Sequence, residues 1–136
     1  MNETRFELID HPSDLGILVH GGNYKETFEN AAYGMFSSMA ELSDIKAEES
    51  FEINVKGDDR EELFINWLNE LIFIWDSKKV LLKDFQIRSL TDKTLKAHVM
   101  GEKIQADLHE LHRPIKAATY NQLELNEKRA KVIFDV

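Results

Sequence analysis

Hydrophobic residues recur every three or four positions in two stretches of the chain, which predicts two amphipathic helices. The first runs from about Tyr24 to Leu42 and the second from about Arg60 to Trp75. Asn23 precedes the first stretch and Asp58 or Asp59 the second, so each helix should begin with a side chain that caps a backbone amide. The hydrophobic stripes are Tyr24, Phe28, Ala31, Ala32, Met35, Phe36, Met39 and Leu42, then Leu63, Phe64, Trp67, Leu68, Leu71, Ile72 and Trp75.

Elsewhere the hydrophobic period is two, as expected for strands with one buried face. The order strand, strand, helix, strand, helix and then several strands predicts an α+β two-layer sandwich. In that sandwich the two helices cover one face of a largely antiparallel sheet. Strands are expected in residues 6–9, 17–21, 51–56, 81–90, 95–100, 116–125 and 130–136.

The segments GGNYKETFENA and KGDDREELFINWL resemble each other, since each has a glycine, a polar cap, an acidic first turn and an aromatic residue in the helix. This similarity indicates a weak internal duplication of a strand-helix unit. Asn66 and Asn69 interrupt the hydrophobic stripe of the second helix. They are expected either to contact a partner or to lie at the solvent margin.

Composition narrows the class of protein. The 136 residues are 43% hydrophobic and 31% charged, which predicts a single folded domain over residues 1–136. No hydrophobic run approaches the roughly 18 residues of a membrane span, and no signal peptide is recognisable, so a cytoplasmic protein is expected. Lys and Arg number 17 against 25 Asp and Glu, and the net charge of −8 argues against direct nucleic-acid binding.

Several kinds of chemistry lack a motif. The chain has no cysteine, so any metal would need oxygen or imidazole ligands. Gly21 and Gly22 lack the lysine and further glycines of a phosphate-binding loop, and no serine lies in a nucleophile-elbow context. His109 and His112 resemble half of a zinc motif without an identifiable third ligand. Solvated loop histidines explain that pair equally well.

The carboxylates are better candidates. The stretch DHPSDLG, residues 10–16, interrupts two strand-like flanks with a proline, a glycine and two aspartates, Asp10 and Asp14. Asp135 precedes Val136 in the last predicted strand and points away from the layer that Phe134 contacts. Two carboxylates and a backbone carbonyl there would suit Ca²⁺, Mg²⁺ or Mn²⁺. The alternative is that Asp135 simply lies at a solvated edge.

Five fragments in series resemble the archease family: DHPSDLGILVHG, ETFENAAYGMF, FINWLNELIF, IKAATYNQLEL and KVIFDV. Their order, their spacing and the overall length match, and the resemblance covers nearly the whole chain. It implies an archease-like fold and an accessory protein without catalytic residues of its own. Its partner would be the RtcB-type RNA ligase, which joins tRNA exon halves and other broken RNAs, and whose guanylylation and repeated turnover archeases promote.

The resemblance also implies a divalent-metal site formed by Asp14, Asp135 and the carbonyl of Val136, with Lys116 as a further functional residue. Calcium is the metal expected in the isolated protein, with manganese or magnesium as alternatives. Lys116 could contact the partner, a phosphate or only a local carboxylate.

Departures from the family pattern bear on these residues. Many members have His-Thr-Ala-Asp where this chain has residues 11–14 as His-Pro-Ser-Asp, and many have Tyr-His where this chain has Tyr120 and Asn121.

Two rival functions stay open. One is a chaperone or specificity factor for a tRNA-modifying enzyme such as a tRNA cytosine methyltransferase. The other is a small metal-dependent hydrolase, for which no general base or nucleophile is recognisable.

Overall fold

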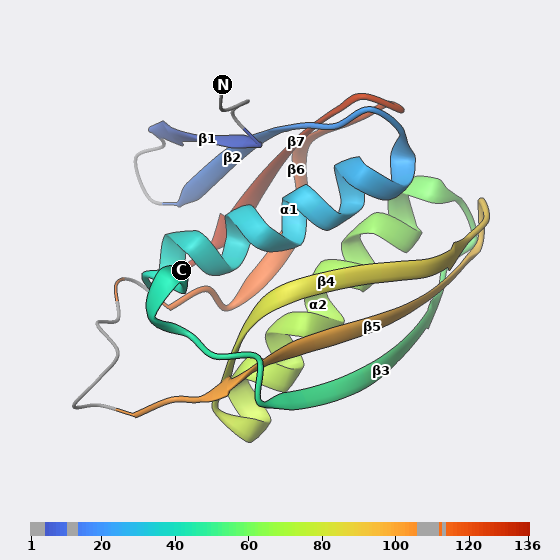
Figure 1. Ribbon diagram of the computed structural model, residues 1–136. Coiled ribbons are helices and arrows are strands. Elements are labelled where there is room, and N and C mark those ends of the chain that lie inside the picture. The colour runs from blue at the N-terminus through green and yellow to red at the C-terminus, as the bar shows by residue number, and fades with distance from the viewer. Residues whose placement is uncertain (1–4, 11–13, 106–111, 113) are drawn as a thin grey trace.

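Helices and strands form where the two hydrophobic periods predict them (Figure 1). The computed structural model describes residues 5–10, 14–105, 112 and 114–136. The helices are α1 (Tyr24–Met39) and α2 (Arg60–Lys78), with a short 3-10 helix η1 (Leu42–Asp44) after α1. The strands are β1 (Phe6–Asp10), β2 (Leu15–His20), β3 (Glu49–Lys56), β4 (Val80–Leu90), β5 (Thr94–Lys103), β6 (Ala117–Leu125) and β7 (Arg129–Asp135).

The predicted caps begin both helices. The side-chain oxygen of Asn23 accepts a hydrogen bond from the amide of Glu26 at 2.8 Å, and that of Asp59 accepts one from the amide of Glu62 at 2.8 Å. Helix α1 ends three residues earlier than predicted, because the backbone becomes extended at Ala40. Helix α2 continues to Lys78 and ends where the next residue adopts a left-handed conformation.

The strands divide into two antiparallel sheets, with the orders β1-β2-β7-β6 and β3-β5-β4. Both helices contact both sheets, since α1 packs on β2 and β4 while α2 packs on β3 and β6. The α+β class, the two amphipathic helices and the antiparallel pairing are confirmed. The structure refines the prediction of one sheet into two, each with one face covered by the helices.

The helices meet in the core through aromatic side chains. The rings of Phe28 and Phe64 are fully buried and pack edge to face, with their centroids 4.9 Å apart. Trp67 is also fully buried, and its indole N–H donates to the carbonyl oxygen of Phe28 at 3.0 Å. The hydrophobic stripes therefore serve packing between the helices as well as packing on the sheets.

The predicted duplication is confirmed and extends beyond the strand-helix segment. We call β2, α1, β6 and β7 the first unit, and β3, α2, β4 and β5 the second unit. In each unit the strand before the helix pairs with the second strand of a hairpin, giving β2 with β7 and β3 with β5. The registers correspond, because the pair Leu15 and Phe134 in the first unit matches the pair Phe51 and Val99 in the second.

The two strand-helix junctions share the same backbone contacts. A Cβ on Gly21 would lie 2.5 Å from the amide nitrogen of Thr27, and a Cβ on Gly57 would lie 2.5 Å from that of Leu63. Neither junction can therefore carry a side chain at its glycine without moving the first turn of its helix. The amide of Gly21 donates to the carbonyl of Lys128 at 3.0 Å, at the turn of the hairpin in its unit.

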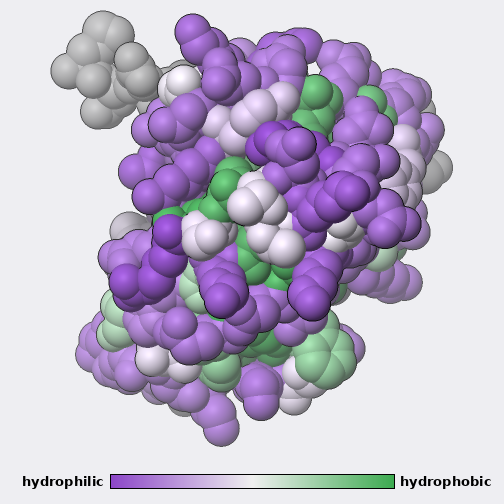
Figure 2. Space-filling view, turned by 90° about the vertical axis from the view of Figure 1, so that its right-hand side faces the viewer, coloured by the Kyte–Doolittle hydropathy of each residue, from purple (hydrophilic) through white to green (hydrophobic). Residues whose placement is uncertain are grey.

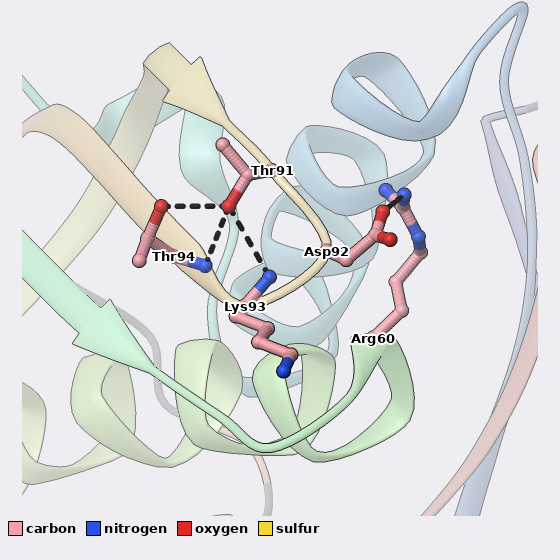
Figure 3. A network of polar contacts seen from close by, with 5 residues as sticks. All are labelled: Arg60, Thr91, Asp92, Lys93 and Thr94. Carbon is pink, nitrogen blue, oxygen red and sulfur yellow. Dashed lines mark hydrogen bonds and ion pairs between the residues drawn. The ribbon is translucent and has the colours of Figure 1, made fainter.

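The second junction repeats that bond and adds a polar network (Figure 3). The amide of Gly57 donates to the carbonyl of Lys93 at 2.9 Å. Around this carbonyl, the hydroxyl of Thr91 accepts from the amides of Lys93 and Thr94. An ion pair between Arg60 and Asp92 ties the turn to the start of α2. Each helix start is thus fixed to the hairpin turn of its own unit.

No helix in the described part of the chain is both long and apolar enough to cross a membrane.

Candidate functional site

The interrupted stretch DHPSDLG connects β1 to β2, which run antiparallel with Asp10 opposite Leu15. Residues 11–13 lie outside the described residues. Gly16 follows, and a Cβ there would approach the Cδ1 of Ile133 to 2.9 Å and the Cβ of Ile9 to 3.2 Å. The absence of a side chain at Gly16 therefore lets β1, β2 and β7 pack closely beside the connection.

The register of β2 and β7 brings the two candidate carboxylates to the same end of the four-stranded sheet. Leu15 pairs with Phe134, so Asp14 and Asp135 are the next residues of the two strands. Alternation places both on the face opposite the helices, because Phe134 is fully buried and Asp135 is exposed. Residues opposed in this way lie about 5 Å apart at Cα in an antiparallel pair.

Lys116 and Val136 lie at the same end. The amide of Lys116 donates to the carbonyl oxygen of Asp135 at 2.8 Å, just before β6 begins. The side chain of Lys116 is exposed, whereas that of Val136 is half-buried and packs against the core. Figure 1 shows the end of the chain and the start of β2 on the same side of the molecule. The four predicted residues therefore converge, although they come from three segments of the chain.

This arrangement provides hard oxygen donors, namely two carboxylates and the main-chain carbonyls at the end of β7. Such donors suit Ca²⁺, Mg²⁺ or Mn²⁺, which retain water in an open site. The residues therefore fit a weakly held divalent cation. Across the described residues, no three acidic or histidine side chains are grouped as a closed metal site would require.

The histidine pair gives no support to a zinc site. His109 lies outside the described residues. The side chain of His112 is exposed, and its amide donates to the carbonyl of Met39 at 2.8 Å. The structural role visible for His112 is therefore a main-chain contact with the end of α1.

The opposite end of the molecule has a shallow hollow of about 390 Å³ beside the start of α2. Figure 2 views the end where the hairpins turn, and hydrophilic residues there surround a smaller area of neutral and hydrophobic ones. The carboxylate of Glu62 in this hollow already accepts from the amide of Asp58 at 2.7 Å. Residues of both charges line the hollow, and they form no recognisable catalytic group. The lining residues are Lys56, Gly57, Asp58, Glu62, Lys93 and Thr94.

Two features of β6 and its contacts were not predicted. Pairing of β6 with β7 is interrupted between Thr119 and Glu124, and Gln122 adopts a positive φ of 53° there. Tyr120 in this bulge is 54% exposed, and partial burial, followed by the nearby carboxylates of α2, raises the pKa of its hydroxyl. The second feature is Asn69, whose side chain reaches the backbone of β6. Neither a bulge nor a side-chain contact to a distant backbone has a clear sequence signature.

Comparison with known proteins agrees with this architecture. Residues 6–136 match the model of the Archease protein family. The chain belongs to the archease family. Protein archease of Methanosarcina mazei is 31% identical, with 97% of this chain and 96% of the relative covered. Protein archease of Sulfolobus acidocaldarius is 35% identical, with 91% and 90% covered.

Solved archease-type structures share the fold. The solution structure of Methanobacterium thermoautotrophicum protein 1598 is 33% identical and superposes with a TM-score of 0.80, covering 97% of this chain and 99% of that one. The crystal structure of an archease from Thermotoga maritima, described as a possible chaperone, is 21% identical with a TM-score of 0.63. That second likeness concerns the fold alone.

Proposed function

We propose that this archease activates an RtcB-type RNA ligase in tRNA splicing and RNA repair, by promoting guanylylation and repeated turnover of the ligase. The observation that carries the proposal is the convergence of Asp14 and Asp135 at one end of the four-stranded sheet, in a member of the archease family. Asp14, Asp135 and the carbonyl of Val136 would hold a divalent cation. The cation supplies positive charge that can balance the phosphates of the nucleotide.

The residues of this site leave it accessible to solvent. The side chain of Asp135 is exposed, and the half-buried side chain of Val136 anchors the end of β7 against the core. The amide of Lys116 already occupies the carbonyl of Asp135, which leaves the carboxylate of that residue for the cation. In this proposal the exposed ammonium of Lys116 contacts a phosphate or an acidic group of the ligase.

The overall charge of −8 supports docking on a basic surface, such as a nucleic-acid cleft not occupied by RNA. Long-range attraction of this kind weakens as salt is added. We therefore expect the affinity of this archease for the ligase to fall with ionic strength. Salt-independent association would contradict electrostatic docking.

The test is guanylylation of an RtcB-type ligase from the same organism with GTP and limiting Mn²⁺. Stimulation should be lost with Asp14→Asn and Asp135→Asn, since each change removes a charged ligand while preserving shape. Asp84→Asn is the matched control, because Asp84 is an exposed aspartate on β4 in the other sheet. Absence of stimulation by the unaltered protein would reject the proposal.

A second candidate is a chaperone or specificity factor for a tRNA-modifying enzyme, such as a tRNA cytosine methyltransferase. The Thermotoga maritima protein that shares the fold is described as a possible chaperone. This function predicts that Asp14→Asn and Asp135→Asn still protect the partner enzyme from aggregation. Hydrolysis of a phosphoester by the isolated protein with Mn²⁺ would instead indicate an enzyme.

A further inference from the structure

Asn69 connects α2 to the strand that begins beside the candidate site. Its side-chain oxygen accepts from the amide of Ala118 at 2.8 Å, and its side-chain nitrogen donates to the carbonyl of Ala118 at 3.4 Å. Both main-chain groups of one residue are therefore held by one carboxamide. Two such bonds restrict the orientation of the strand as well as its position.

The part of β6 that Asn69 holds has a short ladder of its own. Only Ala117, Ala118 and Thr119 pair with β7 before the bulge interrupts the pairing. The hydroxyl of Thr119 adds one bond to the carbonyl of Ile133 at 2.8 Å. β6 is also an edge strand of its sheet, so no further strand supports it within the described residues. The contact with α2 therefore adds to this short ladder in holding the segment.

The candidate site begins two residues before Ala118. The amide of Lys116 donates to the carbonyl of Asp135 at 2.8 Å, so a shift of β6 would move the lysine and weaken its bond to that carbonyl. Asp135 carries one of the two carboxylates of the site. Asn69 is therefore linked to the site by two short steps. Its side chain holds Ala118 of β6, and Lys116, two residues earlier, bonds to Asp135.

The corresponding contact of α1 with β4 shows that the fold itself does not require a carboxamide at this place. Tyr33 of α1 corresponds to Asn69 of α2, because it lies 36 positions earlier, as Gly21 does relative to Gly57. The ring of Tyr33 packs against Phe6, with centroids 6.3 Å apart. Phe85 of β4 corresponds to Ala118, and its ring packs against that of Phe36. Close to that place, α1 instead contacts β4 through the carboxylate of Glu29, which accepts from the amide of Ile87 at 2.8 Å. Between these corresponding positions, the carboxamide contact is therefore made only by α2 to β6.

We infer that Asn69 is a positioning residue, which holds the start of β6 so that Lys116 and Asp135 keep the geometry of the divalent-cation site. The inference rests on the proposed function, because it assigns a role to Asn69 only if a cation binds there. Asn69 touches neither carboxylate in the described contacts and acts through the backbone of β6. This role is analogous to that of outer-shell residues, which orient metal ligands without binding the metal.

The test measures Mn²⁺ binding to the isolated protein by calorimetry, for Asn69→Ala and for Asn66→Ala as the matched control. Asn66 lies one turn earlier on α2 and donates to the carbonyl of Lys56 at 2.8 Å, on the other sheet. Asn69→Ala should weaken Mn²⁺ binding roughly tenfold, as loss of an outer-shell partner does. Asn66→Ala should leave the affinity within about twofold, although it removes a comparable bond.

Amide hydrogen exchange gives a second readout that does not depend on the metal. Exchange at the amide of Lys116 should accelerate in Asn69→Ala and stay unchanged in Asn66→Ala. Equal Mn²⁺ affinities for the two variants would overturn the role of Asn69 while leaving the cation site in place. If the unaltered protein binds no Mn²⁺, or if Asp135→Asn binds it equally well, the cation site fails, and the role of Asn69 fails with it.

Discussion

The two units share a backbone plan but differ in the side chains at the strand ends that lie away from the hairpin turns. In the first unit Asp14 precedes Leu15 and Asp135 follows Phe134, and Leu15 and Phe134 pair with each other. By the same register, Ser50 and Met100 occupy the corresponding positions in the second unit, where they pair with each other. One unit therefore presents two carboxylates where the other presents a hydroxyl and a thioether, although the strands match residue for residue.

The difference shows that the strand-helix-hairpin plan supports chemistry without dictating it. Matching glycines, caps and turns recur in both units because each backbone must make the same close approach between strand and helix. Side chains at the strand ends carry no such constraint, since they point away from the core. A function that depends on those ends can therefore belong to one unit alone.

The largest effect should come from the buried residue that makes the two helices unequal. Trp67 of α2 corresponds to Ala31 of α1, and both are fully buried. Trp67→Ala would leave a cavity and remove the bond that the indole donates to the carbonyl of Phe28, at a cost of about 3–5 kcal/mol in the free energy of unfolding. Urea denaturation measures this cost. Phe73→Ala is the control, because Phe73 is 61% exposed on the same helix, and equal costs would contradict the role of Trp67 in the core.

The junction glycines should respond alike in both units. Gly21→Ala and Gly57→Ala each place a methyl group 2.5 Å from a backbone nitrogen, so each should cost roughly 1–3 kcal/mol through strain. Gly22→Ala is the matched control, since a Cβ there meets only the flexible carboxylate of Glu26, at 3.4 Å. Asp58 occupies the position in the second unit that corresponds to Gly22, so a side chain is tolerated there. Thermal unfolding that ranks Gly22→Ala with the other two would reject the shared constraint.

A smaller and equal effect is expected at the asparagines that join each helix to the preceding strand. Asn30 donates to the carbonyl of His20 at 2.7 Å, and Asn66 donates to that of Lys56 at 2.8 Å. Asn30→Ala and Asn66→Ala should each destabilise the fold by about 1 kcal/mol. Asn54→Ala, at an exposed position on β3, should change stability by at most about 0.5 kcal/mol. Chemical denaturation of the three variants measures these losses in the free energy of unfolding. Clearly different losses for Asn30→Ala and Asn66→Ala would contradict the equivalence of the two units.

The smallest effect concerns pH. Glu29 of α1 accepts from the amide of Ile87 in β4 at 2.8 Å, and burial raises its pKa above the ordinary 4.5, despite that hydrogen bond. The folded state thus holds the proton more tightly than the unfolded chain, so stability falls as pH rises through the folded pKa. Glu29→Gln keeps the acceptor and should remove this part of the pH dependence. Urea midpoints below and above that pKa should diverge between the two proteins, and parallel profiles would contradict the raised pKa.

Sequence patterns predicted nearly all of the fold, because hydrophobic periods and caps are local. They did not predict two sheets, since a period of two identifies the buried face of a strand but not its neighbours. Asp14 and Asp135 were identified as candidates, yet their convergence depends on the pairing of β2 with β7. Asn69 was expected to contact a partner or to lie at the solvent margin. Its bond to β6 was not predicted, because that backbone is brought near only by the tertiary fold.

The order of the strands has a consequence for biosynthesis. The second unit is one continuous segment, residues 49–103, whereas the first unit is completed only by β6 and β7. β7 is an inner strand of its sheet, between β2 and β6, so β2 lacks one of its two neighbours until residues 129–135 have left the ribosome. Domains generally fold as units during translation. A nascent or truncated chain that ends before residue 129 therefore contains the whole second unit but lacks Asp135, so it cannot form the candidate site.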